Sequence, residues 1–257
     1  MKLLFLGDVV GRPGREKLTE GLEKLRRQTE ADFVIVNGEN ASGGRGLNQN
    51  GRDDLLRAGA DVITMGNHVW DNKEIYRFID DEPRIVRPAN YPGYCPGQGL
   101  GVYTCGINQK IAVINLCGRI YMPALDCPFQ AANELIDSVA AKVDFIVVDF
   151  HAEATSEKLA LGYYLDGRVQ AVVGTHTHVH TADERILAQG TAYITDLGMT
   201  GVQDSILGVN KELIIEKFLT QRPTRFGLAE GEAAIQGLLV ELDDASKKAV
   251  SVRRISE

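Results

Sequence analysis

Side chains of the types that can bind metal ions follow five apolar runs of this sequence. They are carboxylates, amides and imidazoles, a donor set that suits iron, manganese, zinc or cobalt, and no thiolate accompanies them as it would in a structural zinc site. Four of the five histidines of the chain belong to this set. We therefore expect a catalytic metal centre whose ligands are Asp8, Glu39, Asn40, Asn67, His151, His176 and His178, with His68 beside them.

The histidines at 176 and 178 are the sharpest local signal. In an extended segment, residues i and i+2 point to the same side, so both imidazoles can face one metal centre. His180 continues the alternation but lies further from the apolar run, and we leave it out of the site. Glu39 also stands out, because a carboxylate after buried strand residues is costly unless it is exposed, paired or bound to metal. Its two oxygens can bridge two cations.

Each residue also has a structural explanation when it is taken alone. Asp8 and Asn40 are common turn residues, and His151 beside an apolar run could be a core histidine with satisfied hydrogen bonds. The glycines at 7, 11 and 14 resemble a phosphate-binding loop, but their spacing matches neither the dinucleotide fingerprint nor the Walker pattern. The metal centre is favoured because five predicted strand ends supply its residues together.

The apolar runs before these residues are short and rich in valine and isoleucine, which is typical of buried strands. Between them lie amphipathic stretches with helical spacing, which indicates an α/β fold. Ligands in open α/β sheets gather beyond the carboxyl ends of the strands, so this order places the site residues together. The expected strands are 3–6, 33–36, 62–65, 111–116, 145–148, 169–173 and 192–194, and the expected helices are 14–28, 53–58, 72–79, 129–141 and 210–220.

The C-terminal part has a different pattern. Residues 233–242 and 249–255 alternate between apolar and polar side chains and are joined by a polar stretch, which predicts a β-hairpin and a second, partly antiparallel sheet. The segment 88–101 is rich in glycine and proline and is expected to form a long surface loop. No repeat or linker divides the chain, so we expect one domain over residues 1–257.

Composition and charge exclude several classes of protein. Hydrophobic residues make up 44% and charged residues 25% of the chain, which is ordinary for a globular protein. The formal net charge of −7 offers no basic field for duplex DNA, so a nucleotide must be captured locally. The first apolar run is too short for a signal peptide or a membrane span, which favours a cytoplasmic protein. Cys95, Cys105, Cys117 and Cys127 lack Cys-x-x-Cys spacing and are expected to be free, buried or half-buried thiols.

Five motifs occur in order along the chain: Gly-Asp at 7–8, Gly-Glu-Asn at 38–40, Gly-Asn-His at 66–68, His151, and Gly-Thr-His-Thr-His at 174–178. This series resembles the calcineurin-like metallophosphoesterase superfamily. More narrowly, Gly-Asp-Val-Val-Gly-Arg-Pro-Gly, Asn-Gly-Glu-Asn-Ala, Met-Gly-Asn-His-Val-Trp and Arg-Pro-Ala-Asn-Tyr-Pro look like a bacterial subfamily of phosphodiesterases that act on 2′,3′-cyclic nucleotides. The resemblance implies a four-layer α/β/β/α sandwich of two mixed sheets covered by helices.

The resemblance also implies how two metal ions share the ligands. Two departures from the superfamily pattern matter, because Val10 stands where a histidine is usual and Glu39 replaces the usual bridging aspartate. The subfamily resemblance implies that Asn40 supplies the missing ligand and that the two divalent or mixed-valence ions are iron or manganese. One ion would be held by Asp8, Glu39, Asn40 and His178, and the other by Glu39, Asn67, His151 and His176.

Such a centre would hydrolyse a phosphodiester. Two metal ions roughly 3.5–4 Å apart bind phosphate oxygens and lower the pKa of a shared water, and the bridging hydroxide attacks phosphorus in line. His68, next to Asn67, is the expected general acid for the leaving alkoxide, because imidazole titrates near neutral pH. The glycine-rich loop after Asn40 could bring Ser42 or Arg45 near the substrate.

Other functions stay open at this point. The same centre would serve a phosphomonoesterase or nucleotidase, and a regulator could bind a nucleotide without turnover. The mark of such a regulator would be missing ligands, and only the histidine replaced by Val10 is missing. We expect a small nucleotide or phosphodiester substrate and no membrane partner. The sequence leaves open RNA ends as substrates, and a homo-oligomer formed through the apolar loops 91–103 and 121–128.

Overall fold

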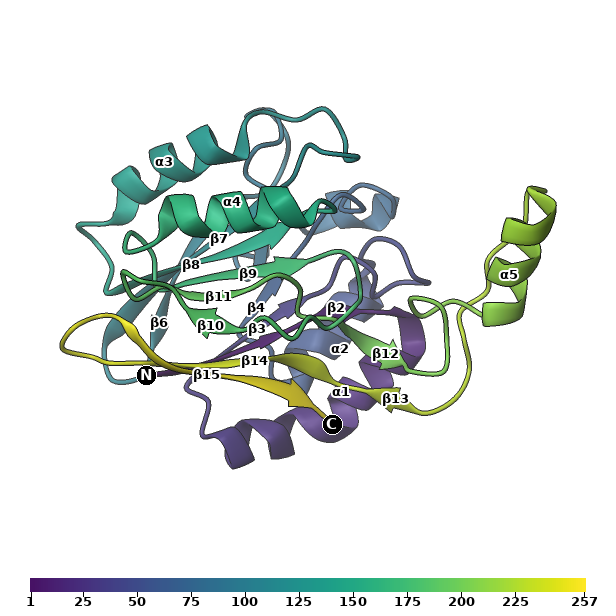
Figure 1. Ribbon diagram of the computed structural model, residues 1–257, viewed down its shortest axis with the longest axis horizontal. Helices are drawn as coiled ribbons and strands as arrows, with labels where there is room; N and C mark the ends of the chain where they lie inside the picture. The colour runs from purple at the N-terminus through teal and green to yellow at the C-terminus, as the bar shows by residue number, and fades with distance from the viewer.

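Two six-stranded sheets pack face to face at the centre of the computed structural model, which describes residues 1–257 (Figure 1). The first has the order β15 (Ala249–Ser256), β14 (Gln236–Leu242), β1 (Lys2–Leu6), β3 (Phe33–Asn37), β4 (Val62–Thr64) and β5 (Ile85–Val86). The second has the order β10 (Arg185–Ile186), β11 (Ala192–Ile194), β9 (Ala171–Thr175), β8 (Phe145–His151), β7 (Gln109–Cys117) and β6 (Leu100–Cys105). A small third sheet joins β13 (Ala233–Ala234), β12 (Met199–Val202) and β2 (Asp8–Val9).

Helices cover the outer faces of both large sheets. The first sheet packs against α1 (Gly11–Thr29) and α2 (Gln49–Ala58), and the second packs against α3 (Pro128–Val139) and α4 (Thr155–Leu165). These layers form the α/β/β/α sandwich that the family resemblance implied. A short 3₁₀ helix, η1 (Lys73–Arg77), follows the first sheet's β4, and α5 (Lys211–Thr220) stands apart from the sandwich in Figure 1.

Three apolar layers hold the sandwich together. In β1, Leu3 and Phe5 belong to the cluster between the two sheets, whereas Leu4 and Leu6 belong to the cluster beneath α1 and α2. This alternation follows from the strand geometry, which sends successive side chains to opposite faces. A third cluster lies between the second sheet and α3 and α4. Because both faces of the central strands are covered, strands such as β1, β3 and β8 are almost continuously apolar, and this made them recognisable in the sequence.

The carboxyl ends of the central strands meet at one edge of the molecule. β1, β3 and β4 run parallel in the first sheet, and β7, β8 and β9 run parallel in the second. After β1 the chain passes so close to β12 that a Cβ at Gly7 would lie 2.1 Å from the carbonyl oxygen of Gly198. Glycine is therefore required here, and this close approach lets β2 pair with β12 and fixes the position of Asp8.

The C-terminal hairpin forms, but the prediction that it makes a second sheet is wrong. β14 pairs antiparallel with β1 and with β15, so the hairpin completes the first sheet. The second sheet consists of residues 100–194 and is mixed, because β6 and β10 run antiparallel to their neighbours. The alternating pattern shows that two strands pair with each other, and it does not reveal which further strand they join.

Other differences concern single elements. The segment 72–79 forms a 3₁₀ helix rather than an α-helix, and the loop predicted over 88–101 ends where β6 begins at Leu100. The helix α4 was not predicted, because its charged Glu157 and Lys158 are buried while Tyr163 and Tyr164 are exposed, which is the reverse of an amphipathic pattern. The other predicted strands and helices form, with ends shifted by a few residues.

The remaining predictions about the whole chain concern thiols and membranes. Cys105 and Cys117 are buried and Cys95 and Cys127 are half-buried, and all four are free, as predicted. None of the helices combines the length and the apolar character that crossing a bilayer requires.

Candidate metal centre

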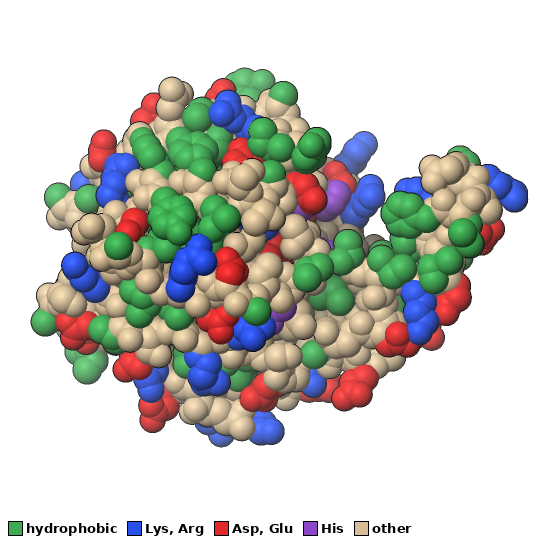
Figure 2. All heavy atoms as spheres, in the orientation of Figure 1, with side chains coloured by type: hydrophobic (Ala, Val, Ile, Leu, Met, Phe, Trp, Pro, Cys, Tyr) green, Lys and Arg blue, Asp and Glu red, His purple; other side chains and the backbone are tan.

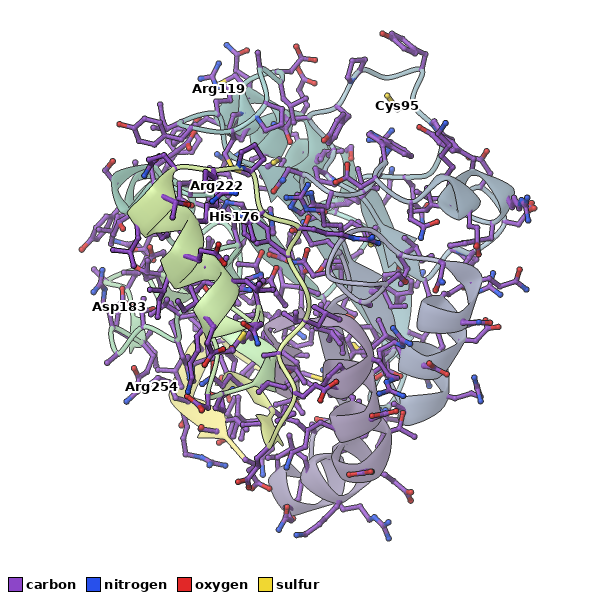
Figure 3. The ribbon with its side chains drawn as sticks, turned by 90° about the vertical axis from the view of Figure 1, so that its right-hand side faces the viewer. Cys95, Arg119, His176, Asp183, Arg222 and Arg254 are labelled. Atoms are coloured by element: carbon purple, nitrogen blue, oxygen red, sulfur yellow. The ribbon has the colours of Figure 1, made fainter.

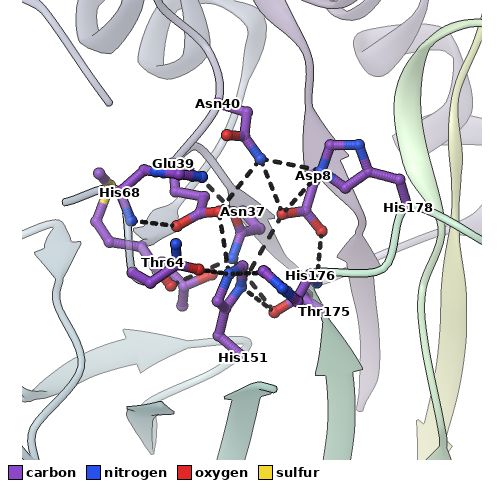
Figure 4. A network of polar contacts seen from close by, with 12 residues as sticks. Asp8, Asn37, Glu39, Asn40, Thr64, His68, His151, Thr175, His176 and His178 are labelled. Atoms are coloured by element: carbon purple, nitrogen blue, oxygen red, sulfur yellow. Dashed lines mark hydrogen bonds and ion pairs between the residues drawn. The ribbon is translucent and has the colours of Figure 1, made fainter. Parts of the chain in front are cut away.

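All seven predicted ligand side chains lie together where the two sheets meet at their carboxyl edge. Figure 4 labels each of them except Asn67. Asp8, Glu39, Asn40 and His151 are at most 3% exposed, so the cluster is built into the protein interior. A charged carboxylate at such depth requires a compensating cation or several hydrogen bonds.

Asn40 connects one half of the cluster. Its Nδ2 donates to Glu39 Oε1 at 3.2 Å, to Asp8 Oδ1 at 3.3 Å and to His178 Nε2 at 3.0 Å. His178 Nε2 in turn lies 3.7 Å from Asp8 Oδ1. A half-turn of the amide about its Cβ–Cγ bond would present Oδ1 to the same atoms, as a metal ligand must. These four residues are the set that the family resemblance assigned to the first ion.

His151 connects the other half. Its Nε2 lies 3.0 Å from Glu39 Oε1, 3.0 Å from Asn67 Oδ1 and 3.0 Å from His176 Nδ1. Ligand atoms of Glu39, His151 and His176 all lie within 4.8 Å of one another, the arrangement of a metal site. Just before Asn67, a Cβ at Gly66 would lie 2.2 Å from Glu39 Oε2, so the Gly-Asn-His motif needs its glycine. Glu39 belongs to both halves.

The two histidines of the 174–178 motif reach the site by a different geometry from the one predicted. His176 has a φ of 106° and His178 a φ of 62°, so the segment is not extended and the i, i+2 argument is wrong. His176 approaches His151, whereas His178 approaches Asp8 and Asn40. Positive φ is costly for residues with a Cβ and is typical of functional sites, where the surrounding structure holds it.

Fixed hydrogen bonds select which nitrogen of His151 faces the cluster. Thr175 Oγ1 donates to Asp149 Oδ1 at 2.7 Å, so it accepts the proton of His151 Nδ1 at 2.9 Å. Asp149 is buried and also accepts from Thr64 Oγ1 at 2.5 Å. Nε2 is therefore the atom of His151 that faces Glu39, and an outer partner of this kind is usual for metal-binding histidines.

The other two imidazoles are oriented in the same way. His178 Nδ1 donates to the carbonyl oxygen of Leu207 at 3.1 Å, which leaves Nε2 as the possible ligand atom. His176 Nε2 lies 3.2 Å from Glu153 Oε2, which leaves Nδ1 facing His151. Each of the three rings thus has one nitrogen held by an acceptor and the other directed into the cluster.

The electrostatics of the cluster fit a site for cations. Burial raises the pKa of Asp8 to about 6. Burial also opposes charge on Glu39 and His151, but their mutual attraction lowers the pKa of Glu39 and raises the pKa of His151. Burial and the charge of His151 lower the pKa of His176 to about 3, so at pH 7 its ring is neutral and keeps a lone pair. The buried carboxylates demand positive charge, which metal ions would supply together with bonds to these oxygen and nitrogen atoms.

His68 stands beside the cluster and is not one of its central members. Its backbone N–H donates to Glu39 Oε2 at 2.9 Å, and its Nδ1 lies 2.8 Å from Asp71 Oδ2. The side chain is 23% exposed and lines the cavity in front of the ligands. The ring therefore lies between the cluster and the cavity.

A buried ion pair holds residues 176–178, the histidine loop, in place. Lys158 of α4 donates to Asp196 Oδ2 at 2.7 Å and to the carbonyl oxygen of Thr175 at 2.8 Å, and both charged side chains are at most 1% exposed. Asp196 also accepts the backbone N–H groups of Thr177 and Gly198. The pair therefore joins α4, the end of β9 and the start of the histidine loop.

A cavity of about 730 Å³ opens in front of the cluster. Glu39, Asn40, His68, His176 and His178 line one part of it, and residues of α5 line another. Figure 2 shows the surface hollowed between the sandwich and α5, with histidine atoms visible there. Figure 3 looks at the molecule from this side, with α5 facing the viewer. The volume is in the range of small-molecule sites.

Sequence reasoning missed the residues that orient the histidines. Glu153 follows His151 at i+2 and Asp71 follows His68 at i+3, so both were visible as carboxylates near a histidine. Lys158 gave no such signal, because it comes from a helix that was not predicted. Of the loop residues weighed for substrate contact, Arg45 lines the cavity, whereas Ser42 hydrogen-bonds Asn48 within its own loop.

Comparisons with known proteins find relatives over nearly the whole chain. A family model described as YmdB-like protein matches residues 4–255. A 2′,3′-cyclic-nucleotide 2′-phosphodiesterase of Bacillus subtilis is 55% identical over 255 residues, which is 99% of this chain and 96% of the relative. A solved hypothetical protein of Thermus thermophilus has a TM-score of 0.94 and 41% identity, covering 100% of this chain and 99% of its own. A solved novel phosphatase of Mycoplasma pneumoniae has a TM-score of 0.93 and 38% identity, covering 100% and 93%.

The range of the family match includes strands of both sheets, the seven proposed ligand residues and His68. The metallophosphoesterase fold expected from the motifs is the fold that the solved phosphatase shares. This chain therefore belongs to the YmdB-like family of calcineurin-like phosphoesterases.

Proposed function

We propose that this chain hydrolyses 2′,3′-cyclic nucleotides and breaks the ester bond to the 2′ oxygen. The chain is a metal-dependent phosphoric diester hydrolase, and the finer assignment follows the name of its Bacillus subtilis relative. The proposal rests on the buried cluster. In it, two sets of possible metal ligands, made of carboxylate, amide and imidazole groups, share Glu39.

Two divalent ions, for which we propose iron or manganese, fit these donors. Asp8, Glu39, Asn40 and His178 would hold one, and Glu39, Asn67, His151 and His176 the other. When bound, such ions supply Lewis-acid charge for the phosphate oxygens and lower the pKa of a water molecule at the site. The protein contributes the rigid placement of the donors, which the outer hydrogen bonds of the three histidines maintain.

His68 is the proposed general acid for the leaving 2′ oxygen. Asp71 holds Nδ1 of the ring at 2.8 Å, so Nε2 is the nitrogen available to a substrate in the cavity. The backbone hydrogen bond to Glu39 Oε2 keeps the residue next to the proposed bridging ligand. A protonated imidazole at this place donates a proton to the alkoxide as the P–O bond breaks.

A phosphomonoesterase is the second candidate, since the Mycoplasma pneumoniae structure is described as a phosphatase. We expect metal-loaded protein to convert 2′,3′-cyclic AMP to 3′-AMP faster than it hydrolyses 3′,5′-cyclic AMP or p-nitrophenyl phosphate. Rates on the three substrates and chromatography of the products test this. A higher kcat/KM on the nitrophenyl monoester would favour the phosphomonoesterase, and nucleotide binding without turnover of any substrate would favour a regulator.

A further inference from the structure

The cavity in front of the proposed metal centre has two unlike ends. The inner end carries the carboxylate, amide and imidazole groups of the centre. The outer end is apolar and includes residues of α5 and of the segments on either side of it. Its apolar side chains are Ile206, Val209, Ile214, Phe218, Phe226 and Leu228, whereas Val10 and Leu207 of the same lining stand next to the centre. A ligand that fills the whole cavity needs one anionic and one apolar part.

Phe218 is the most exposed large side chain of this wall. It is 71% exposed although it lines the cavity, and Ile214 is the only buried residue of α5. Leu219, the next residue, is 80% exposed but does not line the cavity. An aromatic ring left in solvent beside an enzyme site is a surface on which a flat apolar group can be buried.

Two cations without acidic partners face the same cavity. Lys217 has its Nζ 4.6 Å from the centroid of the Phe226 ring, and neither Lys217 nor Arg45 forms an ion pair with a carboxylate. The chain as a whole carries a formal charge of −7, so this local positive charge is not part of a general basic surface. The carboxylates of Glu39 and Glu153 line the cavity as well, so the two cations favour an anionic group only close to themselves.

We propose that the outer end of the cavity is a nucleobase subsite in which the base stacks on Phe218. This inference rests on the proposed function and extends it, because it names α5 as the element that distinguishes nucleotides from other phosphodiesters. With the cyclic phosphate among the metal ligands, the ribose directs the base towards the apolar wall. Stacking on an aromatic side chain tolerates every base, so the subsite accepts purine and pyrimidine nucleotides alike.

The test compares two substrates that differ only in the base. Metal-loaded wild type, Phe218→Ala and Leu219→Ala are assayed with 2′,3′-cyclic AMP and with 1-O-methylribose 2′,3′-cyclic phosphate, which has no base. We expect Phe218→Ala to lower the ratio of kcat/KM values, cyclic AMP over the base-free analogue, by about 5- to 150-fold, the loss of one stacking contact. Leu219→Ala is the matched control on the same helix and leaves the ratio as in wild type. Phe218→Trp, which keeps an aromatic ring at this position, retains the wild-type ratio of kcat/KM values.

The outcomes separate this inference from the proposed function. If wild type hydrolyses both cyclic phosphates but Phe218→Ala keeps the wild-type ratio, the subsite is wrong and the proposed function stands. An equal fall for both substrates, or the same fall in Leu219→Ala, also overturns the subsite, because the effect would then not depend on the base. No hydrolysis of either substrate by metal-loaded wild type would overturn the proposed function itself.

Discussion

Replacing Glu39 by glutamine is expected to remove metal binding and activity together. Glu39 contacts both halves of the cluster through one oxygen, with Oε1 3.0 Å from His151 Nε2 and 3.2 Å from Asn40 Nδ2. An amide has one neutral oxygen and cannot bridge two cations as a carboxylate does. We expect kcat/KM on 2′,3′-cyclic AMP to fall by at least about 10²–10³-fold, and elemental analysis to show less metal than in wild type.

Glu30→Gln provides the matched control for that variant. It makes the same chemical change at a carboxylate that is 77% exposed and pairs with Lys2 at 2.6 Å, outside the metal cluster. We expect it to keep wild-type metal content and activity, because exposed ion pairs contribute little to stability. A Glu39→Gln protein that retained two metal ions and full activity would contradict the bridging role of Glu39.

Replacing His68 by alanine is expected to lower turnover while the metal ions stay bound. The imidazole is not among the groups that surround His151, and its backbone hydrogen bond to Glu39 survives the substitution. Loss of a general acid lowers kcat on 2′,3′-cyclic AMP by about 10²–10⁴-fold. The effect should be much smaller on bis-p-nitrophenyl phosphate, because nitrophenolate leaves without being protonated.

Comparison of the two substrates identifies what His68 does. Wild-type turnover of cyclic AMP by His68→Ala would remove the residue from the mechanism. An equal loss on both substrates would show that the ring positions the phosphate and does not donate a proton. Metal content measured on the same preparations checks that the seven proposed ligands still hold the metal ions.

That the seven proposed ligand side chains lie together could be predicted because of where these residues stand in the chain. Asp8, Glu39 and Asn67 follow parallel strands of one sheet, and His151 and His176 end or follow parallel strands of the other. Parallel strands end at a common edge, so residues that are far apart in sequence become neighbours without knowledge of the loops. The buried strands could be predicted for a related reason, since strands covered on both faces are continuously apolar. The four layers were implied only by the family resemblance.

Contacts that depend on loop conformation could not be predicted. His176 and His178 have positive φ angles, so their side chains do not point to one side as they would in an extended strand. Nothing in the pattern Thr-His-Thr-His requires these angles. Glu153 became a partner of His176 only through the way the loops after β8 and β9 meet. The pairing of the C-terminal hairpin with β1 and the projection of α5 likewise depend on tertiary packing, which local periodicity does not encode.

Metal analysis of protein purified without added metal, run beside hydrolysis of 2′,3′-cyclic AMP before and after chelation, tests the two-metal phosphodiesterase most directly. We expect about two equivalents of iron or manganese per chain, as a two-metal site requires, and loss of the diesterase activity when the chelator removes them. Protein that contains no metal and shows no turnover after reconstitution with either ion would contradict the account.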